Sequence, residues 1–277
     1  MLRSLLIGLD GSPYSAAAIE LCVAWAREFE AALAGIAIID DVTFAARGAA
    51  PLGGEAFKRH RDAVLLQEAR QKIGQHLSEF TARAQQAQVA ARIIDDIGVP
   101  AARIMEEAQA HDLIVLGQRT FYHLRHPDHD DETLHHVLKN APRPVVAVPQ
   151  KIAPGSTVLV AYDGSLQAAR TLQAFEALGL HRARDLYVVS VDQDGEAAER
   201  VASRAKQFLA AHGVMAMPCP TQTKEAPADV ILAQAKALEA QVIVMGAYGK
   251  PALREFLVGS VTRQLLQKSP VPLFLFH

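Results

Sequence analysis

Apolar residues recur along the chain in short, nearly continuous runs, and longer amphipathic stretches separate these runs. In the first half of the chain the runs lie at residues 5–9, 33–39, 89–94, 113–116 and 145–148. In the second half they lie at residues 158–162, 186–191, 216–221, 242–245 and 273–276. Runs that are apolar throughout are typical of strands buried on both faces. Their alternation with helices predicts an α/β fold of two tandem doubly wound domains, each a five-stranded parallel sheet flanked by helices.

The two halves of the chain repeat each other. Leu-Leu-Ile-Gly-Leu-Asp-Gly-Ser near the start has its counterpart in Val-Leu-Val-Ala-Tyr-Asp-Gly-Ser, so that Asp10 matches Asp163. Two later pairs of segments match in the same order, namely 112–117 with 241–246 and 144–148 with 272–276. The first copy is longer in its middle, around residues 44–57, in a stretch rich in Gly, Ala and Pro that is typical of a surface loop. We therefore expect one domain over residues 1–150 and a second over residues 151–277.

Charge and cysteine usage narrow the classes of protein to consider. The 277 residues carry a net charge of -2, so there is no excess of Lys and Arg with which to bind nucleic acid in general. No apolar run approaches the length of a membrane span. The two cysteines, Cys22 and Cys219, form no metal-type or redox-type pair, which favours a reducing compartment. We expect a cytoplasmic protein that binds neither nucleic acid nor a membrane.

A glycine-rich segment in the second half carries the clearest chemical signal. Gly246, Gly249 and Gly259 have the spacing G-x2-G-x9-G, directly after a strand-like run and directly before a helical pattern that starts at Ser260. Glycine lets the backbone approach phosphate oxygens closely, and the free N–H groups of a helix N-terminus favour an anion. Lys250 adds positive charge nearby. The segment predicts a phosphate site, and the alternative is a glycine turn that only joins a strand to a helix.

This segment, with Ser-Pro-Val-Pro after it, resembles the C-terminal signature of the universal stress protein family, specifically its ATP-binding branch. The strand that leads into Asp163 is similar to the opening strand of the same family, so the chain looks like a tandem member. The resemblance implies ATP as the ligand, with or without Mg²⁺. It implies that the first strand's end, a residue ending strand two and the glycine loop hold the nucleotide. In this sequence those positions are Ala161, Tyr162, Asp163, Val191, Met245, Gly246, Gly249, Lys250, Gly259, Ser260, Val261 and Thr262.

Two of these positions have a simpler alternative interpretation. Asp163 is also a suitable helix N-cap or turn residue. Val191 is of a type that more often belongs to the core of a sheet.

The first half departs from the phosphate pattern. Gly117 is retained, but Thr120 stands where Gly249 does, and Asp131 and Glu132 stand where Gly259 and Ser260 do. Two carboxylates would repel phosphate groups, and they would themselves satisfy the start of the following helix as built-in anions. We therefore expect one ATP site per chain, in the second half.

Histidines and aspartates cluster in the same part of the first half. The histidines are His123, His126, His129, His135 and His136, and the aspartates are Asp128, Asp130 and Asp131. These are ligand types for zinc or a similar ion. Their spacing matches no established site, so a solvated loop or an interface is the interpretation we favour, and we expect no metal centre.

Motifs for catalysis are absent from the sequence. It contains no G-x4-G-K-[S/T] loop, no G-x-G-x-x-G fingerprint and no G-x-S-x-G elbow. We therefore expect a regulatory or stress-response module that binds ATP and at most hydrolyses it slowly. Two alternatives stay open, namely a nucleotidyl-transferring enzyme on the same architecture and a metal-responsive scaffold that uses the histidine cluster.

The last strand of each half predicts how the chain assembles. The runs at 145–148 and 273–276 are apolar, and the final strand of a five-stranded sheet is an edge that invites pairing. We expect the two strands to pair antiparallel within one chain, which gives an internal pseudo-dimer, and a homodimer of whole chains stays open.

Overall fold

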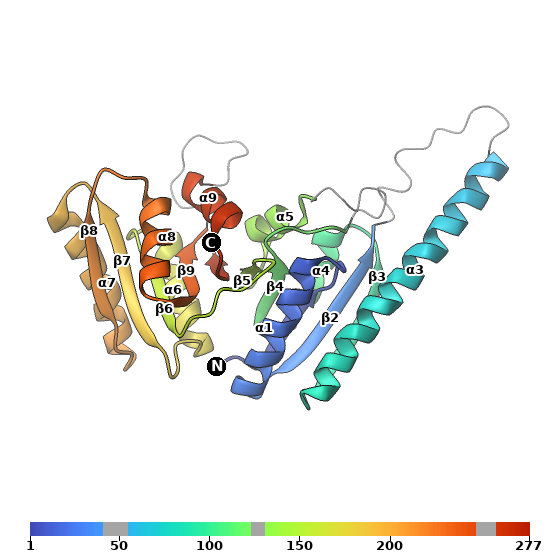
Figure 1. Ribbon diagram of the computed structural model, residues 1–277, viewed down its shortest axis with the longest axis horizontal. Helices are drawn as coiled ribbons and strands as arrows, with labels where there is room; N and C mark the ends of the chain where they lie inside the picture. Colours follow the sequence, from blue (N-terminus) through green and yellow to red (C-terminus); the bar gives the residue numbers. More distant parts are fainter. Residues whose placement is uncertain (41–54, 123–130, 248–258) are drawn as a thin grey trace. The chain divides into compact units, whose positions relative to one another are not determined.

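The computed structural model describes residues 1–40, 55–122, 131–247 and 259–277 of the chain (Figure 1). Contacts between Cα atoms divide the chain into two compact units. The first unit is Arg3–Val137, and the second is Leu138–His277 together with Met1–Leu2. The loop that we expect around residues 44–57 lies outside the described residues up to residue 54, while residues 55–57 are the start of a helix. Most of the histidine cluster also lies outside the described residues.

The first unit is a parallel sheet with helices between its strands. Its elements are β1 (Ser4–Gly8), α1 (Pro13–Phe29), β2 (Ala32–Ile39), α3 (Glu55–Gln86), β3 (Ala91–Ile97), α4 (Pro100–Ala108), β4 (Leu113–Gly117) and α5 (Thr133–Asn140), which runs into the second unit. The strands pair in the order β3-β2-β1-β4, and every pair is parallel. Strand β4 is buried throughout, because helices that follow the parallel strands cover both faces of the sheet.

The second unit repeats this arrangement and adds a strand. Its elements are β5 (Val145–Val148), β6 (Thr157–Ala161), α6 (Leu166–Leu178), β7 (Asp185–Asp192), α7 (Gly195–Ala211), β8 (Met217–Gln222), α8 (Pro227–Ala237), β9 (Ala240–Gly246), α9 (Ser260–Lys268) and β10 (Leu273–Phe276). The order β10-β9-β6-β7-β8 is a five-stranded parallel sheet, as expected for the second half. Helices α6 and α7 contact each other, as do α8 and α9, so two helix layers flank the strands. The α/β, doubly wound class expected from the sequence is confirmed.

The additional strand of the second unit is β5, the last strand of the first repeat. It pairs antiparallel with β10, with Val146 opposite Phe274. This is the pairing of last strands that their apolar sequences predict. Phe274 is fully buried, and its ring contacts that of Phe175 edge to face, with centroids 5.4 Å apart. The pairing therefore belongs to the core of the second unit.

Helix α1 and helix α6 begin in the same way in the two repeats. Ser12 and Ser165 are the N-caps, and each side-chain oxygen accepts a hydrogen bond from an amide three residues on, at 3.2 Å. Gly11 and Gly164 before them have φ of +74° and +75°, a left-handed conformation that glycine adopts without strain. The Asp-Gly-Ser sequence thus places an aspartate at the end of the first strand of each repeat. Of the helices that the structure describes, none combines the length and apolar character needed to cross a membrane.

Candidate nucleotide site

Three strands of the second unit end side by side where the predicted site residues lie. Strand β6 runs between β7 and β9, with Ala161 in register with Val189 of β7 and Met245 of β9. Val191 lies two residues further along β7, and Gly246 is the last residue of β9. Ligands of open parallel sheets bind beyond the carboxyl ends of such strands. The fold therefore brings Ala161, Val191 and Gly246 to one edge of the sheet.

The turn after β6 is held by hydrogen bonds to its neighbours. The Tyr162 amide donates to the Val189 carbonyl at 2.9 Å, and the Ser190 hydroxyl donates to the Tyr162 carbonyl at 2.7 Å. The Asp163 side chain is exposed, and its Oδ1 accepts a hydrogen bond from the Ser165 amide at 2.9 Å. Burial, and then the nearby Asp163 carboxylate, raise the pKa of the Tyr162 hydroxyl. One oxygen of Asp163 thus serves the turn, as the simpler interpretation of this residue requires, and no described residue donates a hydrogen bond to the other.

The glycine at position 246 is explained by packing within the protein. A Cβ at Gly246 would lie 2.6 Å from the backbone nitrogen of Ala168, in the first turn of α6. Real Cβ atoms do not come this close, so only glycine lets the end of β9 lie against α6. The contact with α6 is therefore enough to explain the glycine at this position, without a bound phosphate.

In the described part of the chain, no side chain caps the start of α9. Gly259 is the N-cap residue and has no side chain with which to cap the helix. Among the described residues, the atom nearest to a Cβ added at Gly259 would be the Thr262 hydroxyl oxygen, at 3.9 Å. Ser260, the first residue of the helix, is exposed, Val261 is partly exposed, and Thr262 is buried. Gly249 and Lys250 of the same motif lie outside the described residues.

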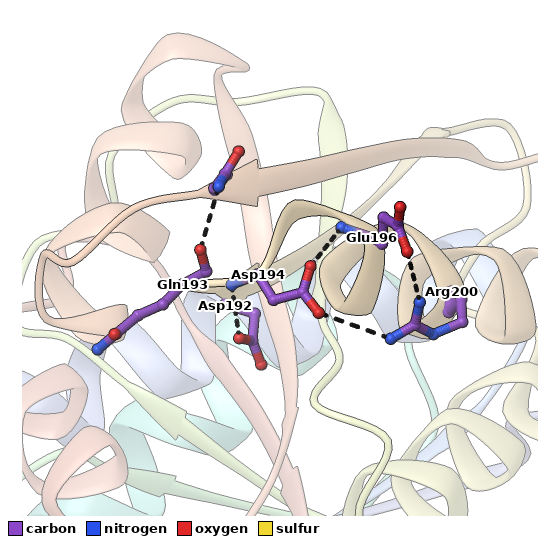
Figure 2. A network of polar contacts seen from close by, with 6 residues as sticks. Asp192, Gln193, Asp194, Glu196 and Arg200 are labelled. Atoms are coloured by element: carbon purple, nitrogen blue, oxygen red, sulfur yellow. Dashed lines mark hydrogen bonds and ion pairs between the residues drawn. The ribbon is translucent and has the colours of Figure 1, made fainter.

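A further network orders the turn from β7 into α7, just beyond Val191 (Figure 2). Asp192 accepts a hydrogen bond from the Asp194 amide at 3.0 Å, and Asp194 accepts one from the Glu196 amide at 2.9 Å. Arg200 forms ion pairs with both Asp194 and Glu196. Exposed ion pairs of this kind contribute little stability. The hydrogen bonds from the Asp194 and Glu196 amides shape the turn, and the second of them caps the start of α7.

The corresponding place in the first unit is closed by the chain's own side chains. Asp131 accepts hydrogen bonds from the Thr120 hydroxyl at 2.5 Å, the Tyr122 amide at 2.6 Å and the Thr133 amide at 2.8 Å. The Leu134 amide donates to the Thr120 oxygen at 3.4 Å. The first two amides of α5 are therefore occupied by a carboxylate and a hydroxyl, as the built-in anion hypothesis predicts for Asp131.

Asp10 is held beside this closed site. Its Oδ1 accepts from the Ser12 amide at 2.9 Å, and its Oδ2 accepts from the Phe121 amide at 2.8 Å. Burial raises the pKa of the Asp10 carboxyl, the Asp131 carboxylate adds to the rise, and the hydrogen bonds from Ser12 and Phe121 oppose it. Two carboxylates thus lie near each other at the end of β1.

A model of the universal stress protein family matches residues 1–149 and 220–277 of the chain. The chain belongs to the universal stress protein family. The matched residues include the glycine segment of the second unit and the opening strand of the first. Asp163 and Val191 lie between the two matched stretches.

Individual proteins resemble the chain in sequence or in fold. Slr1230 of Synechocystis is 25% identical over 169 residues, which is 60% of this chain and 58% of that relative. A universal stress protein from Archaeoglobus fulgidus has a crystal structure that covers 99% of this chain and 97% of its own, with a TM-score of 0.74 at 20% identity. A functionally unknown protein from Pseudomonas aeruginosa covers 99% of this chain and 92% of its own, with a TM-score of 0.57 at 17% identity. These structures show that the whole chain shares its fold with them.

The histidine cluster of this universal stress protein is described only in part. His123, His126, His129, Asp128 and Asp130 lie outside the described residues. His135 and His136 are on α5. Among the described residues, no three His, Cys, Asp or Glu side chains are arranged to hold a metal ion.

The structure also brings together residues that carry no motif. Lys72 and His76 of α3 line a pocket beside Asp10, with Phe121 from the loop after β4. Nothing in the sequence around Lys72 and His76 indicates a site, because the residues that line the pocket with them, such as Asp10 and Phe121, are distant in the chain. The sequence signal that could have found the pocket is the repeat itself, which places Asp10 where Asp163 lies in the second half.

Proposed function

We propose that this universal stress protein binds one ATP, with or without Mg²⁺, in the second half of the chain and acts as a regulatory or stress-response module. The nucleotide would lie beyond the carboxyl ends of β6, β7 and β9. Ala161, Tyr162, Asp163, Val191 and Met245 with Gly246 would face its nucleoside. Gly249, Lys250 and Gly259 with Ser260, Val261 and Thr262 would hold its phosphates.

One observation carries this proposal, namely the contrast between two helix starts at matching positions of the repeat. At α5 the Asp131 carboxylate already accepts from the Thr133 amide at 2.8 Å, so an anion is in place. At α9 the N-cap is Gly259, and within the described part of the chain no side chain caps the helix. The partial positive charge of a helix N-terminus favours an anion. The start of α9 is thus suited to phosphate, while that of α5 is not.

Replacement of Gly259 tests the proposal, because in the described part of the chain the nearest atom to an added Cβ is 3.9 Å away. Gly259→Asp would place a carboxylate at α9 as Asp131 does at α5. We expect the affinity for ATP, measured by calorimetry, to fall about 100-fold or more, since each lost charge-assisted hydrogen bond is worth about 1.5–3 kcal/mol. Gly259→Ala adds a Cβ without charge and should change the affinity by less than about tenfold.

The folded state provides the control for this experiment. Aspartate is a favourable N-cap, so Gly259→Asp should unfold at the same urea concentration as the wild type or a higher one. An aspartate variant that binds ATP as tightly as the wild type would contradict the proposal. If Gly259→Asp loses both ATP binding and stability, the loss of binding is explained by unfolding and not by the added carboxylate.

We propose a binding module in the cytoplasm. The sequence has no nucleophile with a positioned base, and ATP held without an activating group suits a sensor or a slow hydrolase. Cys22 and Cys219 are both free thiols, which fits a reducing compartment.

A further inference from the structure

Strand β3 is the outermost strand of the first unit, and the backbone groups on its outer side have no partner. Among the described strands, β3 pairs with β2 alone. Just outside its two ends, the backbone groups of Ala90 and Gly98 form hydrogen bonds of 2.9 Å with β2. Because the direction of these groups alternates along a strand, those of Ala91, Ile93 and Asp95 point away from β2. In the described part of the chain, no hydrogen bond reaches these outward groups.

The free part of this strand is short and has an apolar residue at its centre. Ile97, the next outward residue, is already satisfied, because its amide donates to Asp96 Oδ1 at 2.7 Å and its carbonyl accepts from Arg103 Nε at 3.3 Å. Ile93 is 55% exposed, although isoleucine is usually buried. We refer to residues 91–95 as the β3 edge. This edge offers three outward backbone positions around one exposed apolar side chain.

The outermost strand of the second unit is protected against pairing, in contrast to β3. The Thr223 amide, just after β8, donates to the Asp192 carbonyl of β7 at 3.0 Å. By the same alternation, Pro218, Pro220 and Gln222 of β8 point outward. Proline has no amide hydrogen, so two of these outward positions have no donor to offer a further strand. Proline on an edge strand is one of the means by which proteins prevent edge-to-edge association, and β3 has no proline.

We infer that two copies of the chain pair antiparallel through the β3 edge, about a two-fold axis at Ile93. Two-fold dimers are the commonest symmetric assemblies. This register sets Ile93 opposite itself, and Ala91 of each copy opposite Asp95 of the other. All three outward positions then exchange backbone hydrogen bonds, about six in total. The two exposed isoleucine side chains cover each other at the axis.

The charges on one face of β3 are complementary in this register. Arg92 forms an ion pair with Glu107 of α4 at 3.2 Å, and Asp96 forms one with Arg103 of the same helix at 3.5 Å, so both side chains lie on the α4 face. Across the axis, Arg92 lies diagonally from Asp96 of the second copy, at about 7–8 Å, which a long side chain spans. The two Arg92 side chains are the other diagonal pair, and each already has its own Glu107. No residues of like charge lie directly opposite each other.

The interface is a single strand pair, so the dimer should dissociate on dilution. Interfaces that bury less than about 1,200 Å² belong to weak and transient complexes. Analytical ultracentrifugation of the full-length chain should give a mass that rises with concentration from 29.9 kDa toward twice that value. A mass of 29.9 kDa at every concentration up to the solubility limit would overturn the inference.

Ile93→Lys tests the β3 edge, and Met215→Lys is the matched control. Ile93→Lys removes the apolar contact and sets two like charges opposite each other at the axis, so the dissociation constant of the dimer should rise about tenfold or more. Met215 is 89% exposed and lies in the second unit, so the same change there should leave the constant as it is. An Ile93→Lys chain that dimerises as tightly as the wild type would overturn the inference.

Cysteine cross-linking tests the register, and it decides the question even if Ile93→Lys fails to fold. In a hydrogen-bonded antiparallel pair the Cα atoms lie about 5.5 Å apart, a distance that a disulfide spans. Ile93→Cys in a Cys219→Ser chain should therefore form a covalent dimer on mild oxidation, since Cys22 is buried. Asp95→Cys in the same background should not, because its two copies would lie more than about 13 Å apart. No cross-link at residue 93, or an equally fast one at residue 95, would overturn the proposed pairing.

Discussion

At the scale of single residues, the Asp-Gly-Ser turn shows how one sequence serves two different environments. In both repeats the aspartate Oδ1 accepts from the serine amide at 2.9 Å, so this bond belongs to the turn. In the first repeat the second oxygen of Asp10 accepts from the Phe121 amide at 2.8 Å, and the carboxyl is enclosed. In the second repeat the Asp163 side chain is exposed. The residues around the turn, and not the turn itself, decide what the aspartate can bind.

The enclosure of Asp10 predicts a pH dependence of stability. Its pKa is raised above 3.8 by burial, so the folded chain holds this proton more firmly than the unfolded chain. The protonation of Asp10 therefore stabilises the folded chain below about pH 3.8, and this stabilisation is lost as the pH rises through the pKa of the folded state. Asp10→Asn does not titrate, so its free energy of unfolding should rise relative to the wild type between about pH 3.8 and pH 7. Urea denaturation at several pH values measures the difference in free energy of unfolding between Asp10→Asn and the wild type. A difference that does not change with pH would contradict a raised pKa of the buried Asp10.

At the scale of elements, the end of β9 is placed by its contact with α6. The backbone of Gly246 lies so near Ala168 that a Cβ would come within 2.6 Å of its nitrogen. Gly246→Ala should lower the free energy of unfolding by about 1–3 kcal/mol, as overpacking does. Gly259→Ala, where the nearest described atom would be 3.9 Å away, should lower it by about 1 kcal/mol or less, because only the N-cap preference changes. Equal urea midpoints for the two variants would show that β9 and α6 have room to separate.

Most strands could be predicted from the sequence, because burial on both faces gives continuous apolar runs. Strand β5 and strand β10 have the predicted bounds, and β4 gains only Gly117. The outermost strands are less regular. Strand β3 was expected at 89–94 and is Ala91–Ile97. Most residues of β8 are exposed. Among the described strands, β3 and β8 each have a neighbouring strand on one side only. At such an edge a polar or proline residue costs little, and the apolar signal fades.

The candidate site could be predicted only in part. The strand ends at Ala161 and Gly246 follow from the repeat and from the rule that ligands bind at carboxyl ends. The Asp131 contacts with Thr120 and Tyr122 could not be read from the sequence, because these residues are 11 and 9 positions away in a loop without periodicity. These contacts hold the Asp131 carboxylate at the start of α5, so the first repeat supplies its own anion there.

At the scale of the whole molecule, strand β5 of the first repeat completes the second unit by pairing with β10. A fragment of residues 151–277 lacks β5, so the edge of β10, whose Leu273, Phe274 and Leu275 are fully buried in the intact chain, would be bared. This fragment should self-associate, and light scattering should then give a mass above that of the monomer. A soluble monomer would show that β5 is dispensable and would count against the internal pseudo-dimer that we propose.

The number of ATP sites in the intact chain tests the central claim most directly. Two repeats of one fold would bind two nucleotides if the fold alone decided binding. The contrast between Asp131 at α5 and Gly259 at α9 instead predicts one. Calorimetric titration of the full-length, unmodified chain with ATP should give one site per chain. Two equivalent sites, or none, would contradict the account.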